Sequence, residues 1–184
     1  MEVYIPENIE ENEILVYFVF NRDFKKKIAS YDNIISKDIF LPNKGSVSLQ
    51  RNKYCDETKC KSLAKKIEHN RIYTGFVIFR KIDFKTVKKK YITEDREDFD
   101  AELIYSPLDE NLNKIELPKK ILSSDSGNPA HSEIKYLNPA VKENETPNTA
   151  IRSFSRKLYK KCKLIIDDEP NLKYYNGELF KDII

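Results

Sequence analysis

The amino-acid sequence predicts an α+β fold with a mainly antiparallel central sheet, two main helices, one long proline-rich irregular region and a C-terminal hairpin. Three observations favour this fold class. The run Ile14–Phe20 is rich in β-branched and aromatic residues and is typical of a central strand that is buried on both faces. Two stretches with helical periodicity lie far apart in the chain. Between them, residues 107–147 contain five of the eight prolines, which disfavour helix there.

The elements of the first half follow from local patterns. The alternation in Ser46–Gln50 predicts a strand with one solvated face. Asp56 is expected to cap a helix that runs to about His69 and carries an apolar stripe made of Cys60, Leu63, Ala64 and Ile67. Further strands are predicted at residues 73–79 and 101–105. The lysine-rich stretch Lys85–Lys90 is expected to be a short helix or an exposed loop.

The second half contains one more helix and the predicted hairpin. A helix is expected from Asn148 to about Lys163, because Ile151, Phe154, Leu158 and Cys162 fall on one face. Asn176-Gly177 lies between aromatic and apolar residues and indicates a hairpin turn. We therefore expect a single domain over residues 1–184, with an acidic N-terminal arm (1–13), the irregular proline-rich insertion (107–147) and an aromatic tail (170–184).

Composition excludes several classes of function. The four glycines are scattered, and neither GxxxxGK[ST] nor GxGxxG occurs, which argues against the P-loop and Rossmann modes of nucleotide binding. The two histidines are too few for a histidine-cluster metal site, so no metal is predicted. A net charge of +3 is too mild for a dedicated nucleic-acid binder, so a nucleic-acid partner is not expected.

Cysteine usage and hydropathy predict the compartment. Three cysteines, an odd number, without a signal peptide indicate reduced thiols in a cytoplasm. The longest apolar run has seven residues, whereas a membrane-spanning helix needs about eighteen or more. The sequence therefore predicts a cytoplasmic protein with no membrane partner.

Two surface features are candidate binding sites. A basic helix carries Arg152, Arg156 and Lys160, which we interpret first as the solvated face of an amphipathic helix. The alternative is a contact with an acidic protein surface or with nucleic-acid phosphates. The tail carries Tyr174, Tyr175 and Phe180, and aromatic residues are favoured anchors of protein interfaces.

The segment Gly127–Ile134 contains a candidate catalytic residue. His131 lies outside the predicted helices, and it shares a face with Glu133 if the segment is a strand. A histidine near neutrality acts as an acid, a base or a hydrogen-bond donor. The alternative interpretation is that His131 only ties the loop to backbone carbonyl groups.

The order of short motifs resembles that of an uncharacterised family of small bacterial proteins. Its series of Ser-Ser-x-x-Phe, Ser-Val, Gly-Phe, Asp-Pro-Leu and Pro-Ala-His has counterparts here at Ser36 and Phe40, Ser46-Val47, Gly75-Phe76, Ser106–Asp109 and Asn128–His131. Lys37 replaces the second serine, and about twenty residues separate the last two motifs where the family has only a few. The resemblance covers about residues 15–160. It implies a bacterial cytoplasmic domain and, by association, a stress or phage-defence system.

Two functions from different classes are predicted. The first is a protein-interaction or accessory component of a bacterial multi-gene system, whose partner is another protein of the same operon and which needs no cofactor. The alternative is a nucleotide-handling enzyme that resembles ADP-ribosyltransferases and uses NAD. In that enzyme Arg22 holds a pyrophosphate, Ser46 and Ser48 brace the site, and Glu133 stabilises a ribosyl cation or orients the group that attacks it. We expect the candidate site residues to gather in space: Arg22, Ser36, Ser46, Ser48, His131 and Glu133.

Overall fold

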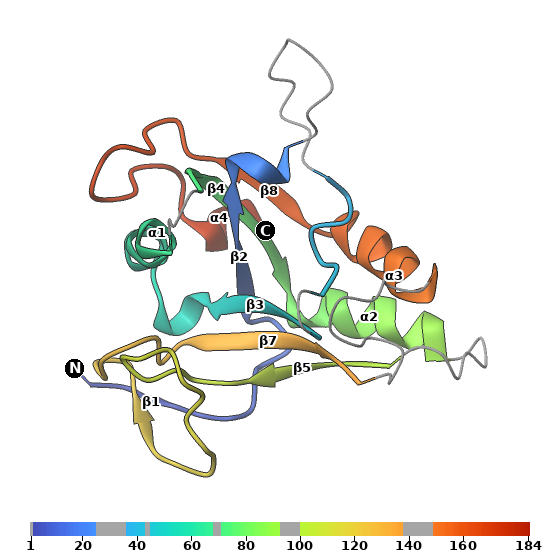
Figure 1. Cartoon of the computed structure of the whole chain (residues 1–184), viewed down its shortest axis with the longest axis horizontal. Helices are drawn as coiled ribbons and strands as arrows, with labels where there is room; N and C mark the ends of the chain where they lie inside the picture. Colours follow the sequence, from blue (N-terminus) through green and yellow to red (C-terminus); the bar gives the residue numbers. More distant parts are fainter. Residues whose placement is uncertain (1, 25–35, 43–44, 68–70, 93–99, 138–148) are drawn as a thin grey trace.

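The computed structural model describes residues 2–24, 36–42, 45–67, 71–92 (side chains to 89), 100–137 and 149–184. These residues form a six-stranded antiparallel sheet in the order β5-β7-β3-β2-β4-β8 and a small sheet of β1 and β6 (Figure 1). The strands are β1 Tyr4–Ile5, β2 Ile14–Phe20, β3 Ser46–Arg51, β4 Tyr73–Arg80, β5 Ala101–Tyr105, β6 Ile121–Leu122, β7 His131–Tyr136 and β8 Lys163–Ile166. The predicted α+β class with a mainly antiparallel sheet is confirmed.

Helices cover both faces of the sheet. They are α1 Glu57–Lys66, α2 Lys81–Ile92, α3 Thr149–Tyr159 and α4 Phe180–Ile183. Figure 1 shows α2 and α3 on one side of β2 and β4, and α1 and α4 on the other. The predicted cap of α1 is confirmed, because the Asp56 carboxylate accepts a hydrogen bond from the Lys59 amide at 2.8 Å. The lysine-rich stretch that was expected to be a helix or a loop is part of α2.

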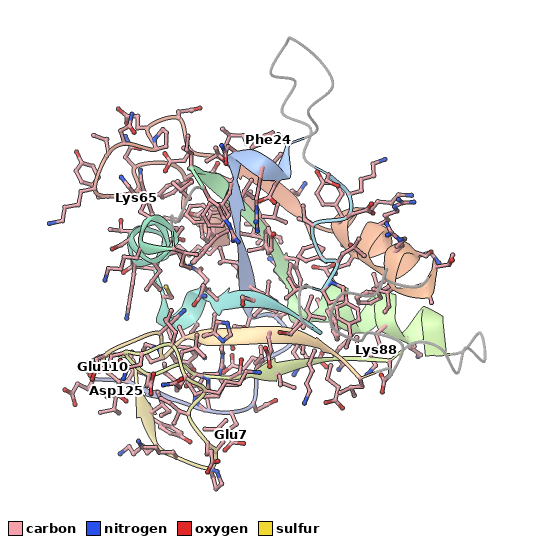
Figure 2. The ribbon with its side chains drawn as sticks, viewed as in Figure 1. Glu7, Phe24, Lys65, Lys88, Glu110 and Asp125 are labelled. Carbon is pink, nitrogen blue, oxygen red and sulfur yellow. The ribbon has the colours of Figure 1, made fainter. Side chains whose placement is uncertain are left out.

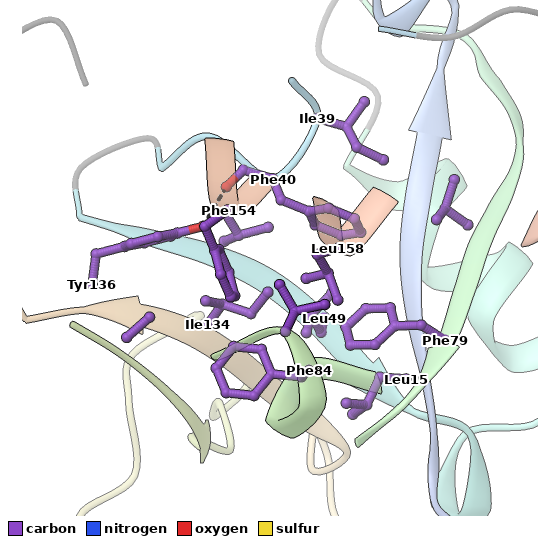
Figure 3. Packing of buried hydrophobic residues seen from close by; sticks show 14 of the residues in the cluster. Leu15, Ile39, Phe40, Leu49, Phe79, Phe84, Ile134, Tyr136, Phe154 and Leu158 are labelled. Carbon is purple, nitrogen blue, oxygen red and sulfur yellow. Dashed lines mark hydrogen bonds between the residues drawn. The ribbon is translucent and has the colours of Figure 1, made fainter. Parts of the chain in front are cut away.

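One core fills the space between the sheet and the α2–α3 pair (Figure 3). Leu15, Leu49 and Phe79 point into it from three adjacent strands, and Phe154 lies between the Phe84 and Tyr136 rings. The Tyr136 hydroxyl donates a hydrogen bond to the Phe40 carbonyl at 2.7 Å, so the polar end of this buried side chain is satisfied.

A second core lies on the opposite face, under α1 and α4. Because successive side chains of a strand alternate between faces, Val16 and Phe18 of β2 point into this core while Leu15 and Val19 point into the first. The prediction that β2 is buried on both faces is therefore confirmed. Figure 2 shows the side chains, with the exposed carboxylates of Glu110 and Asp125 on the connection between β5 and β7.

The predicted C-terminal hairpin is wrong. The segment after β8 forms no strand and ends in α4. Tyr175 and Phe180 turn inward and pack on Phe76, with ring centroids 5.8 and 5.0 Å away, instead of pairing across the Asn-Gly turn. The buried Lys61 ammonium also binds the carbonyl oxygens of Glu169 and Tyr174, so the tail is tied to α1. Tertiary packing thus overrides the local turn signal.

Two other regions differ in detail from the prediction. The helix that was expected from Asn148 to about Lys163 is α3, which already ends at Tyr159. Lys163, the expected last residue of the helix, begins the edge strand β8 instead. The proline-rich region is irregular from 107 to 130 except for β6, but it then forms β7, which is an interior strand. β7 begins after Pro129 and contains no proline, so its amides are free to pair. Residues 138–148 of this region and His69 lie outside the described residues.

The acidic N-terminal arm is joined to β3 by a buried ion pair. Both oxygens of the Glu13 carboxylate bind the Arg51 guanidinium, at 2.5 and 2.9 Å, and both side chains are almost completely buried. The same guanidinium donates to the Pro6 and Asn8 carbonyl oxygens. The arm therefore packs as part of the folded chain over these residues.

Candidate functional site

The candidate site lies where β2 and β3 separate. These neighbouring strands pair only at Leu15 with Arg51 and at Val16 with Gln50. Beyond this point β2 continues to pair with β4, while β3 continues to pair with β7. The two strands therefore diverge from a common point and enclose a cleft that is closed near Val16 and Gln50.

One wall of the cleft presents backbone polar groups. The Arg51 amide donates to Ala130, and the Gly45 carbonyl accepts from Tyr136, so the odd-numbered residues of β3 turn their peptide groups toward β7. Since peptide groups alternate along an antiparallel strand, those of Ser46 and Ser48 face the cleft. None of the described segments of β2 pairs with them. This wall can form hydrogen bonds with a bound molecule.

The cleft encloses about 370 Å³ and combines apolar walls with polar groups. The apolar part comes from β2 and from the segment before β3, including Phe18, Phe20, Ile39 and Leu41. Leu108 and Leu112, from the connection between β5 and β7, also line the cleft. The polar lining residues are Arg22, Ser46, Ser48, Gln50, Arg71, Asn128 and His131.

Three polar side chains lie at the closed end and are almost completely buried. Gln50, Asn128 and His131 are 3%, 6% and 5% exposed. The amide oxygens of Gln50 and Asn128 have no hydrogen-bond partner among the described residues. Buried polar atoms are normally paired, so these two oxygens indicate a place where a bound molecule or water completes the structure.

The contacts of His131 define which ring nitrogen carries the proton. Its Nδ1 lies 2.7 Å from the Ser106 carbonyl oxygen and 3.0 Å from the Ser106 hydroxyl. A carbonyl oxygen only accepts, so Nδ1 is the donor. Burial lowers the pKa of His131, which keeps the ring neutral and leaves Nε2 as an acceptor. No described residue hydrogen-bonds Nε2. The alternative interpretation, that His131 ties the chain to a carbonyl group, is therefore correct for Nδ1 only.

The open end of the cleft carries positive charge. Arg22 follows β2 and Arg71 precedes β4, and the Arg71 guanidinium lies 5.9 Å from the centroid of the Phe20 ring. The Asp23 carboxylate is nearby and accepts a hydrogen bond from the Phe20 amide at 2.8 Å. Burial raises the pKa of Asp23, and the two arginines oppose this shift. Two cations against one carboxylate leave a net positive charge.

The structure brings four of the six expected site residues together. Arg22, Ser46, Ser48 and His131 line the cleft. Glu133 lies opposite Ser48 in the β3–β7 pair, but its buried carboxylate binds the Lys114 ammonium at 2.5 Å and does not line the cleft. Ser36 does not line the cleft but a groove beside Lys37, Asp38, Arg156 and Lys160. Its amide donates to the carbonyl oxygen of Asp23, the neighbour of Arg22, at 2.8 Å.

The predicted binding residues have internal contacts. Arg156 pairs with Asp38 at 2.7 Å, Arg152 lies 3.9 Å from the same carboxylate, and Lys160 lines the small groove beside them. In the tail, Phe180 is buried and Tyr175 packs against it. Tyr174 is the exposed member of this group, at 56%. The tail therefore contributes mainly to the second core.

Sequence analysis missed three polar residues of the cleft, Gln50, Asn128 and Arg71. Gln50 continues the same-face alternation of Ser46 and Ser48, so the strand pattern contained the signal. Asn128 stands in the Asn-Pro-Ala-His motif that includes His131. Arg71 has no comparable local signal, because only the fold brings the start of β4 beside the end of β2.

Comparisons with known proteins find no match: no protein family fits the sequence, and no characterised protein or solved structure is significantly similar. The helices formed by the described residues are too short or too polar to cross a bilayer.

A larger hollow of about 810 Å³ lies beside α2, and its charged lining includes Lys81, Lys85 and Lys88. Among the described residues, the buried side-chain oxygens without a partner belong to Gln50, Asn128 and Ser132, and the first two of these residues line the β2–β3 cleft.

Proposed function

We propose that this chain is a nucleotide-binding domain and that the β2–β3 cleft is its binding site. One observation carries the proposal. The closed end has buried polar atoms without partners, at Gln50 and Asn128, while the open end has two arginines, Arg22 and Arg71. A molecule with a hydrogen-bonding ring at one end and a phosphate at the other satisfies both ends of the cleft.

The dimensions of the cleft support a mononucleotide. Its volume of about 370 Å³ falls within the usual range for small-molecule sites. Four residues of β2 separate Val16 at the closed end from Phe20 near the arginines, which corresponds to about 13 Å at about 3.3 Å per residue. The Phe18 and Phe20 side chains offer apolar contact to a planar ring between these ends.

Arginine side chains replace the glycine loop in this proposal. P-loops and Rossmann folds hold phosphate with backbone amides at a helix N-terminus. Here Arg22 and Arg71 provide charged donors, and a guanidinium binds two phosphate oxygens at once. The absence of a glycine-rich motif from the sequence is therefore compatible with binding of a nucleotide.

Arg71→Ala tests the proposal. We expect wild-type protein to bind a member of a panel of AMP, GMP, CMP, UMP, ADP and NAD by titration calorimetry. Arg71→Ala should weaken that binding at least about tenfold, because a charge-assisted hydrogen bond contributes roughly 1.5–3 kcal/mol.

Lys160→Ala is the matched control, because it removes the same charge from a different groove. Equal affinities of the two variants would contradict the proposed phosphate position. No binding of any nucleotide in the panel would overturn the function itself.

Transfer of ADP-ribose from NAD is a second candidate function. Arg22, Ser46 and Ser48 line one cleft, as that reaction requires. The Glu133 carboxylate would have to leave Lys114 to reach the cleft, and the two lie 2.5 Å apart. Incubation with labelled NAD tests this function, and the absence of both released nicotinamide and transferred label would exclude it.

The accessory role in a bacterial system is a further proposal, and exposed apolar side chains on the cleft rim support it. Leu112 is 67% exposed and Ile67 is 43% exposed, and both suit a protein contact. The partner would be a protein of the same operon in the cytoplasm, within a stress or phage-defence system. Affinity purification from the native host should recover it in stoichiometric amount with wild type and lose it with Leu112→Ser. Recovery of no stoichiometric partner would contradict this role.

A further inference from the structure

We infer that the closed end of the cleft selects a nucleotide by an amino group on its base, as found in adenine. This inference rests on the proposed nucleotide-binding function. It follows from the kind of atoms that the fold leaves without partners. They include the amide oxygens of Gln50 and Asn128. His131 Nε2 lines the same cleft as a further acceptor, because the hydrogen bonds of the ring to described residues are made by Nδ1.

His131 determines whether the closed end of the cleft requires a hydrogen-bond donor or an acceptor from the bound molecule. An amide side chain can rotate to exchange its oxygen and nitrogen, whereas the role of each imidazole nitrogen depends on the tautomer, which the contacts of the ring favour. The Ser106 carbonyl oxygen, 2.7 Å from Nδ1, requires the proton there. Nε2 of the neutral ring is then an acceptor, and it needs a donor from the bound molecule.

The three side chains belong to one small region. Gln50 lies directly opposite His131 in the β3–β7 pair, so both side chains point to the same face of the sheet. Asn128 precedes His131 by three residues, and its carbonyl oxygen accepts from the His131 amide at 3.2 Å. All three side chains line the cleft. The closed end therefore presents several acceptors to a bound molecule.

An exocyclic amino group fits this arrangement, because it carries two donors and no charge. A charged ammonium group would lose its hydration among the nearby apolar side chains, at a much larger cost. An oxo group in the same place would bring an acceptor against acceptors. The base edge of adenine also offers a ring nitrogen that accepts, and a side-chain amide of glutamine or asparagine pairs with such an edge through both of its polar atoms.

The remaining polar groups of the cleft match the rest of a nucleotide. The Ser46 and Ser48 peptide groups line the wall between the two ends, where ribose hydroxyl groups would lie. Arg22 and Arg71 stand at the open end. The base is thus placed inward and the phosphate outward.

A pair of nucleotides tests the inference on the wild-type protein. Purine riboside 5′-monophosphate is AMP without the 6-amino group. We expect it to bind at least about tenfold more weakly than AMP in titration calorimetry, because it leaves buried acceptors unpaired. Equal or tighter binding of the analogue would overturn the inference. If neither nucleotide binds and the rest of the panel also fails, the proposed function itself has failed.

Gln50→Leu provides a second test with an independent readout. The variant removes an unpaired buried oxygen and keeps a similar shape, so we expect the melting temperature of the free protein to stay equal or rise. It should weaken AMP binding about tenfold and reduce the difference in affinity between AMP and purine riboside 5′-monophosphate. Unchanged affinities in a folded Gln50→Leu protein, with Lys160→Ala as the control, would contradict the role of Gln50.

Discussion

At the scale of single residues, His131 shows how one backbone contact defines a chemical role. The bond from Nδ1 to the Ser106 carbonyl holds the ring, and burial lowers its pKa. Two charges act in opposite directions, because Glu133 raises the pKa and Lys114 lowers it. The neutral ring then turns an acceptor to the cleft, which the residue type alone does not reveal.

The lowered pKa of His131 predicts a loss of stability in acid. In the unfolded chain the histidine takes up a proton near pH 6.5, whereas in the folded protein it does so only at a lower pH. The unfolded state therefore binds more protons as the pH falls below about 6.5, and the free energy of unfolding decreases. His131→Gln should lose less stability between pH 7 and pH 5, as measured by urea unfolding.

His69→Gln, which removes the other histidine, is the control for this experiment. If wild type and His131→Gln show the same decrease in unfolding free energy over this pH range, a lowered pKa at His131 is contradicted.

At the scale of elements, the short pairing of β2 with β3 produces the cleft. Two residue pairs join these strands, whereas β2 and β4 pair along seven residues. The peptide groups of Ser46 and Ser48 therefore do not pair with β2. The arm before β2 reinforces the point of divergence, since Glu13 binds Arg51, the last residue of β3.

The ion pair between Glu13 and Arg51 predicts a large effect of one substitution. Glu13→Gln leaves the buried guanidinium without its counter-charge, so we expect the free energy of unfolding to fall by about 3–5 kcal/mol. Denaturant unfolding measures this change. Glu10→Gln is the matched control on the same arm, because Glu10 pairs with Lys53 at the exposed surface and should leave stability nearly unchanged. Equal decreases in the free energy of unfolding for both substitutions would show that the buried ion pair contributes no more to stability than the exposed one.

At the scale of the whole molecule, both ends of the chain are tied to the interior by buried basic residues. Arg51 holds the N-terminal arm, and Lys61 holds the tail through Asp167 at 2.8 Å and two carbonyl oxygens. The Tyr73 hydroxyl also donates to Asp167 at 3.0 Å. The second core depends on this arrangement, because Phe180 of the tail completes it.

Lys61→Met tests the attachment of the tail. The substitution leaves the Asp167 carboxylate buried without its cation, which typically costs about 3–5 kcal/mol. We expect proteases to cleave between residues 170 and 180 faster than in wild type, as followed by mass spectrometry. The exposed Lys66 on the same helix provides the control Lys66→Met. Cleavage at the wild-type rate in Lys61→Met would contradict the attachment.

Local patterns predicted the elements whose signal lies within a few residues. A continuous apolar run placed β2, and helical periodicity placed α1 and most of α3. Strand alternation put Ser46 and Ser48 on one face, because it reflects which side of the strand meets the core. The same alternation put His131 on the face of Glu133. The hairpin predicted for the tail is wrong because the Asn-Gly turn competes with packing of Tyr175 and Phe180 on β4, a strand that is distant in sequence.

The sequence by itself determined the α+β class and the polar residues that β3 and β7 present on one face. Only the tertiary structure decided that β2 and β3 stop pairing after two residue pairs, that Arg71 joins Arg22, and that Gln50 and Asn128 keep unpaired oxygens. The physical reason is the separation along the sequence between the residues that interact. A side chain's face depends on its neighbours along the chain, whereas strand divergence and buried polar groups depend on contacts between segments that are distant in sequence.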